Sequence, residues 1–137
     1  MKLRGKFLLL GTSIVIMSLF IGYYLLPKEK IESKGYLQHN LTVSFGNRVE
    51  SRIVALPNGS TVFDLLNKSY SMKYKEYGNM GKMILAIDGV EQNSTHSWIY
   101  YVNGKFADRA SDKYPLIQDS KVEWYFMKNE DIMSIFS

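Results

Sequence analysis

Two aromatic segments, the first of which ends in a two-residue turn, constrain the fold of this chain more than any other feature. Residues 98–105 read WIYYVNGK, and residues 121–126 read KVEWYF. The side chains of an extended segment point alternately to its two faces. Both alternating sets of the first segment are apolar or aromatic, which predicts a central strand covered on both faces. Asn103 and Gly104 supply the positive φ angles of a tight turn, so we expect a hairpin here.

The N-terminal segment predicts a membrane anchor. Residues 7–26 carry no charge over twenty positions, which is enough to cross a hydrocarbon core of roughly 30 Å. Lys2, Arg4 and Lys6 precede this run, and positive charge favours the cytoplasmic side. We therefore expect residues 1–27 to be the uncleaved signal anchor, or transmembrane helix, of a single-pass protein of the cell membrane, with the rest of the chain extracytoplasmic. The alternative is a cleaved signal and a secreted protein.

Charge and cysteine content exclude one class of partner and one class of scaffold. The net charge of +4 belongs to the first thirty residues, because residues 31–137 hold twelve Lys or Arg and twelve Asp or Glu. Nucleic-acid binding requires a local excess of cations, so we expect no nucleic-acid partner. The chain has no cysteine. No disulfide therefore supports the outer part, and its hydrophobic core must suffice.

Composition divides the chain after the anchor into three parts. Residues 28–40 are polar and poor in large apolar side chains, so we interpret them as a short stalk. Residues 41–128 carry the periodic segments and have the size of one small domain. Residues 129–137 are predicted to be a C-terminal tail.

The periodic segments of this domain predict one helix packed on a mostly antiparallel sheet. Apolar and polar residues alternate over 41–45, and a turn leads to a second run over 49–56, which predicts a hairpin. Thr61 is predicted to cap a helix that begins at the next residue and ends between residues 70 and 77. A compact strand over 83–87 and the aromatic strands follow. This order is typical of an α+β architecture.

Five short motifs carry a resemblance to a known family. They are TVFDLL at 61–66, IDG at 87–89, WIYYVNG at 98–104, YPLIQD at 114–119 and VEWY at 122–125. In this order and spacing they resemble the successive motifs of the transcobalamin C-terminal-like family. The resemblance implies a β-grasp-like fold. In the cobalamin carriers of that family such a domain caps the vitamin against a helical barrel, whereas most bacterial and archaeal relatives are secreted or membrane-anchored modules of unknown role.

Cobalamin, or another corrinoid, is thus implied as a ligand by the resemblance alone, and no other cofactor is implied. The chain shows no pattern of a helical barrel. A ligand of that size needs most of its surface covered, so a second protein would have to supply the other wall.

Residues that carry catalysis or bind metals are few and scattered. His39 in the stalk and His96 before the aromatic strand have no cysteine or carboxylate pair beside them, so we expect exposed loop histidines and no metal site. Ser94 lies near His96 in the sequence, but no orienting acid accompanies the two. We therefore expect a protein that is not an enzyme. Four aspartates are interpreted as turn residues and not as calcium ligands: Asp88, Asp108, Asp112 and Asp119.

The aromatic strands supply the candidate ligand-binding residues. Tyrosine and tryptophan offer a large contact area with a polar group that can face water. Tyr101 and Tyr125 are predicted to form an exposed platform, since they alternate with the residues expected in the core. Trp98 and Asn103 are further candidates for ligand contact. For Trp98 and Trp124 core packing is the favoured interpretation, and for Asn103 a turn role.

Asn-X-Ser/Thr sequons are frequent in the outer part of the chain. We predict that Asn40, Asn58 and Asn93 are glycosylation acceptors on surface loops, in a host that glycosylates asparagine. Asn67 also lies in such a sequon, but it falls within the predicted helix.

The sequence thus predicts a membrane-anchored, extracytoplasmic binding module that recognises a protein or glycan partner. One alternative is a soluble-ligand binder of the corrinoid type that a second protein completes. Another is an accessory subunit of a membrane complex, held through residues 7–26, whose small and polar residues favour helix contacts.

Overall fold

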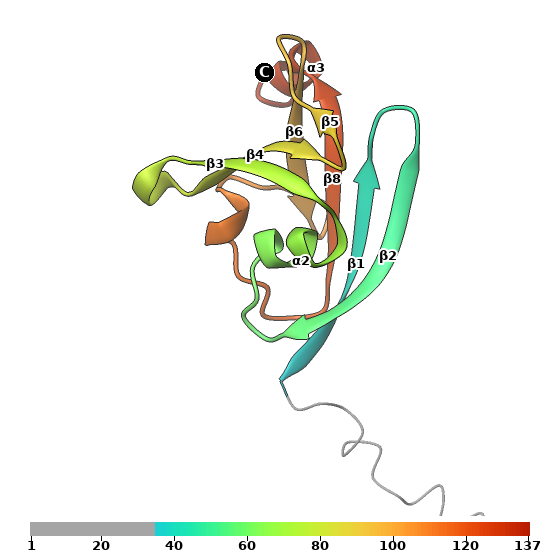
Figure 1. The fold of residues 1–137 in the computed structure, drawn as a ribbon, viewed down its shortest axis with the longest axis vertical. Coiled ribbons are helices and arrows are strands. Elements are labelled where there is room, and N and C mark those ends of the chain that lie inside the picture. The colour runs from blue at the N-terminus through green and yellow to red at the C-terminus, as the bar shows by residue number, and fades with distance from the viewer. Residues whose placement is uncertain (1–34) are drawn as a thin grey trace, which may run out of the picture. The chain divides into compact units, whose positions relative to one another are not determined.

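Two small sheets and a short helix make up the part of the chain that the structure describes. The computed structural model describes residues 35–137 (Figure 1), and the predicted anchor and most of the predicted stalk lie outside them. Within this range no helix has the length and apolarity to span a membrane. The elements are β1 (Tyr36–Ser44), β2 (Val49–Pro57), α2 (Val62–Ser69), β3 (Met72–Glu76), η2 (Gly78–Met80), β4 (Lys82–Ile87), β5 (Val90–Glu91), β6 (His96–Val102), β7 (Lys105–Phe106), η3 (Ser111–Lys113), β8 (Ser120–Lys128) and α3 (Asn129–Ile135).

The larger sheet of the described range has five strands in the order β2-β1-β8-β6-β7. Strand β1 pairs with β8 in parallel, and the other neighbouring pairs of this sheet are antiparallel. The β1–β2 hairpin confirms the prediction from the sequence, and the two aromatic segments are strands, β6 and β8, as predicted. The antiparallel pairing of β6 with β8 is a finding of the structure alone. The turn between β6 and β7 is also the predicted one, since Asn103 and Gly104 have φ angles of 51° and 79°.

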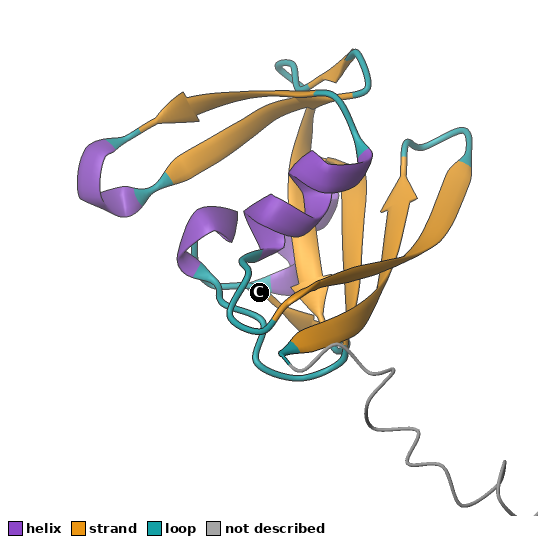
Figure 2. Ribbon diagram, turned by 60° about the horizontal axis from the view of Figure 1, so that its bottom comes forward, coloured by secondary structure: helices purple, strands orange, loops and turns teal. Residues whose placement is uncertain are grey.

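Helix α2 packs against one face of this sheet (Figure 2). Thr61 caps it as predicted: its hydroxyl accepts a hydrogen bond from the backbone N of Asp64 at 3.1 Å, and the Asp64 carboxylate accepts one from the backbone N of Thr61 at 2.9 Å. This reciprocal pair satisfies two amides that the helix start leaves free. The predicted α+β class, with a mostly antiparallel sheet, is confirmed. The helix buries four residues, Val62, Phe63, Leu65 and Leu66.

The helix ends at Ser69, before the predicted range of 70 to 77, and the chain continues as a strand. Tyr70 is already extended, with a φ of −137° and a ψ of 148°. Strand β3 pairs antiparallel with β4, and β5 completes a three-stranded sheet in the order β3-β4-β5. Pairing with β4 is a tertiary interaction that local sequence does not reveal.

Strand β1 begins at Tyr36, so the end of the predicted stalk is a strand. His39 is consequently not an exposed loop residue, because its side chain has no exposed area. Its Nδ1 accepts a hydrogen bond from the backbone N of Ser120 at 3.2 Å. Burial lowers the pKa of His39, and the nearby Asp119 carboxylate opposes that shift. The prediction was wrong because residues 36–40 look polar, whereas β1 pairs with β2 along its whole length.

The predicted C-terminal tail contains the short helix α3 and is attached to the larger sheet. The backbone N of Asn129 donates to the carbonyl of Thr95 at 2.8 Å, and the Ser97 hydroxyl donates to the Asn129 side-chain oxygen at 2.7 Å. Phe136 packs edge-on against Phe106 of β7, with 5.1 Å between the ring centroids.

The hydrophobic core lies between the larger sheet, helix α2 and strand β4. Trp98 and Trp124 belong to it and are 8% and 2% exposed, which confirms their interpretation as core residues. The buried residues of the core are Leu41, Val43, Phe45, Leu56, Val62, Phe63, Leu65, Leu66, Tyr70, Ile84, Ile87, Trp98, Tyr100, Val102, Leu116, Val122 and Trp124.

Candidate functional site

An open cavity of about 490 Å³ lies beside strand β6. Four parts of the chain line it: the end of the β3–β4 hairpin over residues 77–84, strand β6 over residues 98–100, the segment 106–111 that begins at the end of β7, and Trp124 of β8. Its volume is within the range of small-molecule sites in proteins. The cavity is therefore the candidate functional site of the described residues.

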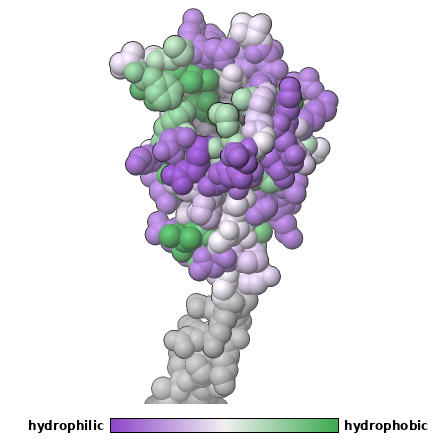
Figure 3. Space-filling model, turned by 90° about the vertical axis from the view of Figure 1, so that its left-hand side faces the viewer, coloured by the Kyte–Doolittle hydropathy of each residue, from purple (hydrophilic) through white to green (hydrophobic). Residues whose placement is uncertain are grey.

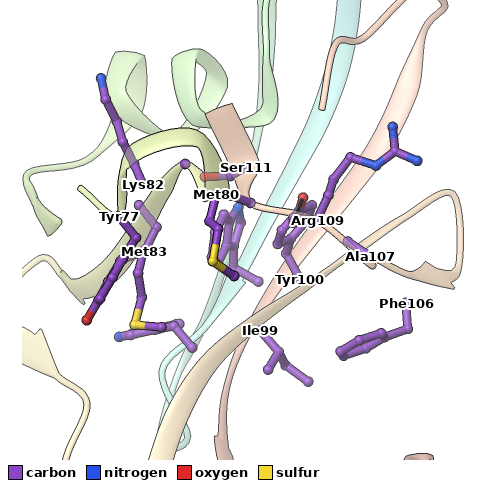
Figure 4. A pocket seen from close by; sticks show the side chains of 15 residues that line it. Tyr77, Met80, Lys82, Met83, Ile99, Tyr100, Phe106, Ala107, Arg109 and Ser111 are labelled. Atoms are coloured by element: carbon purple, nitrogen blue, oxygen red, sulfur yellow. Dashed lines mark hydrogen bonds between the residues drawn. The ribbon is translucent and has the colours of Figure 1, made fainter. Parts of the chain in front are cut away.

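The side chains around the cavity are mostly apolar. Figure 4 shows Met80 and Met83 of the β3–β4 hairpin on one side, and Ile99 and Phe106 on the other. Met80 is 81% exposed and Met83 is 46% exposed. Figure 3 shows the face of the domain that carries this hairpin, where apolar surface forms patches among hydrophilic side chains. Methionine side chains are flexible and polarizable, so this wall can adapt its shape to a ligand.

A close backbone approach holds the hairpin wall beside the segment 106–111. Gly81 has a φ of 100°, and a Cβ at this position would lie 2.6 Å from the Cβ of Ala110 and 2.6 Å from Oδ1 of Asp112. The same Oδ1 accepts a hydrogen bond from the backbone N of Lys82 at 2.9 Å. Only glycine fits this position, because it permits both the positive φ angle and the short approach.

The hydroxyl of Tyr100 fixes the opposite wall. It donates a hydrogen bond to the carbonyl of Arg109 at 2.6 Å. Burial raises the pKa of Tyr100 well above its usual range, so the hydroxyl remains a proton donor throughout the physiological pH range.

Two buried polar atoms of cavity-lining residues have no hydrogen-bond partner among residues 35–137. They are the hydroxyl of Ser111 and the indole Nε1 of Trp124. Each residue is 2% exposed. A buried polar group without a partner costs about 1–3 kcal/mol, so native proteins pair such groups with protein, water or ligand. Both atoms lie beneath the surface of the cavity, so this cost falls on the folded protein itself.

The cationic side chains at the rim of the cavity already have partners. Lys82 Nζ lies 4.6 Å from the ring centroid of Phe63 and 4.0 Å from Glu76 Oε1. The guanidinium of Arg109 pairs with Asp108 at 3.1 Å. The lining is thus mainly apolar, which favours an occupant with a large apolar part.

The structure divides the predicted ligand-binding residues among three places. Trp98 lines the cavity, and its Nε1 donates to the carbonyl of Val90 at 2.9 Å. Tyr101 and Tyr125 lie together on the opposite face of the larger sheet, with 5.6 Å between their ring centroids. Both are half-buried, so the predicted platform is only partly exposed. Asn103 lies in the turn, where its Oδ1 accepts a hydrogen bond from a backbone N of β8 at 2.9 Å.

A hydrogen bond to Glu123 raises the pKa of Tyr125 to about 12, with burial as the second cause. The phenol of the predicted platform is therefore engaged within its own strand.

Met80, Met83 and Ser111 are cavity residues that the sequence reasoning missed. One signal pointed towards Met80, since it precedes Gly81 in a segment rich in turn residues, where an apolar side chain has no packing role. Met83 belongs to the predicted strand over 83–87, and no signal distinguished it. No local signal identified Ser111, because its burial depends on contacts with distant segments.

His96 and its neighbours form a small polar cluster away from the cavity. The ring of His96 stacks on Phe126 at 5.0 Å, and its Nδ1 lies 2.9 Å from the Thr95 hydroxyl. Ser94 contributes its carbonyl to a hydrogen bond from the side chain of Asn129. Among residues 35–137 no group of three or more His, Cys, Asp or Glu side chains is arranged to hold a metal ion.

The predicted glycosylation sites lie on the surface of the described domain. Asn40, Asn58 and Asn93 are exposed, and so is Asn67 on helix α2. Asn40 lies within strand β1 and not in a loop. Their use as acceptors stays a prediction.

Comparison with known proteins gives one family match. The sequence pattern of the family described as "Domain of unknown function (DUF4430)" matches residues 59–128. Among curated proteins, none matches this chain.

Two solved structures illustrate the similarity of fold. Haptocorrin in complex with Cbi is 19% identical to this chain, with a TM-score of 0.59, and the match covers 68% of this chain and 25% of haptocorrin. A protein of Ruminococcus gnavus ATCC 29149, to which metal binding is ascribed, is 14% identical, with a TM-score of 0.57, and the match covers 68% of this chain and 98% of that protein. The chain therefore matches about a quarter of haptocorrin.

Proposed function

We propose that this chain, which belongs to the DUF4430 family and has a transcobalamin C-terminal-like fold, is a non-catalytic binding module. Its ligand occupies the cavity beside β6. The observation that carries this proposal is the open cavity of about 490 Å³, whose lining is mainly apolar. A ligand with a large apolar part fits this lining.

We place this module outside the cell, on a single-pass anchor formed by residues 7–26. The uncharged run and the cationic residues before it support this orientation. The first candidate for the ligand is a partner protein, since the cavity is open and its methionine wall is exposed. A glycan suits this mainly apolar lining less well.

A corrinoid is the second candidate, because haptocorrin, which shares this fold, is in complex with Cbi. The open cavity would enclose only part of such a ligand, so a second protein would have to cover the remainder. Titration of the full chain in lipid nanodiscs with cobalamin, followed by corrin absorbance, tests this candidate. A spectral change that the double variant M80S/M83S loses would support it, and an unchanged spectrum would remove it for the chain without a partner.

Methionine methyl resonances test the cavity itself. The full chain is placed in lipid nanodiscs with ¹³C-methyl methionine and titrated with indole, a small aromatic probe. We expect the methyl signals of Met80 and Met83 to shift with saturation, because indole enters the cavity that they line. Met133, which is 70% exposed on α3, serves as the matched control. Shifts of equal size at Met133, or no shift at Met80 and Met83, would contradict the proposal.

A further inference from the structure

We infer that the cavity receives an extended peptide segment of a partner protein, which adds as a strand to the free edge of β6. This inference rests on the proposed function and specifies the class of its ligand.

The edge of β6 is only partly covered within the described residues. Strand β8 pairs with β6 along its whole length on one side, from His96 to Val102. On the other side β7 pairs with Tyr101 and Val102 alone. Trp98, Ile99 and Tyr100 therefore have a neighbouring strand on one side only.

The cavity lies directly at this free edge. Consecutive residues of a strand point to opposite faces, yet Trp98, Ile99 and Tyr100 all line the cavity. Three consecutive residues can share one cavity only if it lies beside the strand, where backbone atoms are also accessible to an occupant.

The hydrogen-bond pattern shows which backbone groups point into the cavity. The backbone N of Asn103 donates to the carbonyl of Lys121 at 2.8 Å, which makes these two residues a hydrogen-bonded pair. Such pairs recur at every second residue of an antiparallel ladder, so Tyr101 and Ile99 bond to β8, whereas Tyr100 and Trp98 direct their N–H and C=O groups to the free edge. The bond from the backbone N of Ala107 to the carbonyl of Tyr100, at 3.1 Å, agrees with this assignment.

Three of these edge groups have no hydrogen-bond partner in the described part of the chain. They are the N–H and the C=O of Trp98 and the N–H of Tyr100. An antiparallel peptide strand would pair with both groups of Trp98, and a parallel one with the C=O of Trp98 and the N–H of Tyr100. In either direction the complement is the main chain of an extended peptide, a group that most small ligands do not offer.

Both ends of the free edge are closed, which sets the length of the site. Beyond Tyr100 the edge is occupied by β7, so a bound strand would lie next to β7 along the same edge of β6. At the other end the backbone N of Asn93 donates to the carbonyl of His96 at 3.0 Å. About three residues of peptide therefore fit between these limits, given a rise of roughly 3.3 Å per residue.

Side-chain alternation specifies what the peptide carries. A residue opposite Trp98 points to the same face of the sheet as Trp98, into the cavity that Trp98, Met80 and Met83 line. Large apolar side chains fit this part of the cavity. The adjacent peptide residues point to the other face of the sheet, beside Ile99 and Phe106.

The test is a random dodecapeptide library, displayed on phage and panned on the full chain in lipid nanodiscs. Enriched peptides are then synthesised with a single N-methyl group at each backbone position in turn. We expect about tenfold weaker binding on N-methylation of the amide that donates to Trp98, and little change on methylation of the adjacent amide, which points away from β6. We further expect slower hydrogen exchange of the Trp98 and Tyr100 amides in the complex.

Matched variants of the protein locate the site. The double variant M80S/M83S should weaken peptide binding about tenfold, because it removes the apolar wall. The variant M133S should leave binding unchanged, since Met133 lies on α3, outside the cavity.

The outcomes distinguish this inference from the proposed function. Strand addition would be overturned if each peptide with a single methylated amide bound as well as the unmethylated peptide, whichever amide carries the methyl group. Slow exchange of the Trp98 and Tyr100 amides before any peptide is added would also overturn it, because another part of the chain or a second copy would then occupy the edge. If no peptide is enriched while indole still shifts Met80 and Met83, strand addition fails and the binding function stands. If indole also has no effect, both fail.

Discussion

The two sheets of this domain differ in how much of each is buried, and the difference separates stability from binding. In the larger sheet, Leu41 and Val43 of β1 and Val122 of β8 have no exposed area. In the smaller sheet, every residue of β3 after Met72 is exposed. The first sheet has the packing of a folding core, whereas β3 is held mainly by its pairing with β4 and by the edge-on contact of Tyr74 with Phe63 of α2, at 5.1 Å between ring centroids.

This difference indicates where the domain can change shape at low cost. Segments with few buried apolar contacts open with less free energy than the core. The β3–β4 hairpin supplies the methionine wall of the cavity, so the adaptable part of the binding site lies in the less stable region. The opposite wall, formed by β6, is part of the rigid sheet.

The largest expected effect comes from a core substitution. Leu66→Ala removes a side chain of α2 with no exposed area, and we expect a loss of about 3 kcal/mol of unfolding free energy. Met80→Ala, at the hairpin, should change it by less than about 0.5 kcal/mol. Urea unfolding of both variants measures the contrast. Similar losses in the two variants would show that the hairpin is as much a part of the core as the helix.

A substitution at Gly81 tests the contact that holds the β3–β4 hairpin against the segment 106–112. Gly81→Ala should cost about 2–3 kcal/mol, because the new Cβ meets Ala110 and Asp112 at a positive φ angle. Gly78→Ala, in the same turn, also has a positive φ but meets nothing within 4 Å, so about 1 kcal/mol is expected. Thermal unfolding gives both values, and equal costs would argue against the close approach. Weaker indole binding in Gly81→Ala alone would confirm that this contact positions the cavity wall.

Removal of an unpaired hydroxyl should stabilise the protein without ligand. Ser111→Ala should raise the unfolding free energy by about 1 kcal/mol, because it removes a buried polar atom that lacks a partner. Ser97→Ala is the matched control: it removes a hydroxyl that donates to Asn129, and a loss of about 1 kcal/mol is expected. Urea unfolding measures the change in unfolding free energy of each variant, a gain for Ser111→Ala and a loss for Ser97→Ala. A destabilised Ser111→Ala protein would indicate that a bound water already satisfies the hydroxyl.

The smallest expected effect is a pH dependence from the buried histidine of β1. The pKa of His39 in the folded protein lies below its ordinary value of 6.5, mainly because of burial. As the pH falls through about 6.5, the unfolded chain binds the proton first, so the unfolding free energy decreases until the folded-state pKa is reached. Measurements between pH 8 and 5 exclude a contribution from the carboxylates of Glu50 and Glu91. Their pKa values are lowered in the folded protein, so their effect on the unfolding free energy begins below about pH 4.5.

His39→Asn should flatten this profile, since its amide oxygen can accept the bond from Ser120 without titrating. An unchanged slope in His39→Asn would assign it to another group.

Local sequence predicted the elements that depend on local interactions. The turn at Asn103 and Gly104 and the cap at Thr61 were predicted correctly, because the necessary φ angles and the capping hydroxyl belong to these residues themselves. Alternation of side chains likewise identified β6 and β8. The same reasoning failed for β3 and for the start of β1, where pairing with a distant strand outweighs polar composition.

The aromatic strands and the helix start could thus be derived from the residues alone, because hydrophobic periodicity and turn chemistry act within a few positions of the chain. The resemblance to the transcobalamin C-terminal-like family rested on short sequence motifs. The cavity could not be derived in either way. Its walls come from residues 77–84, 98–100 and 106–111 and from Trp124, and whether Ser111 is buried or Met80 exposed depends on which segments pack together in space. Strand β7 pairs only with Tyr101 and Val102 of β6 and leaves the rest of that edge uncovered. The free edge beside the cavity is therefore a property of the tertiary structure.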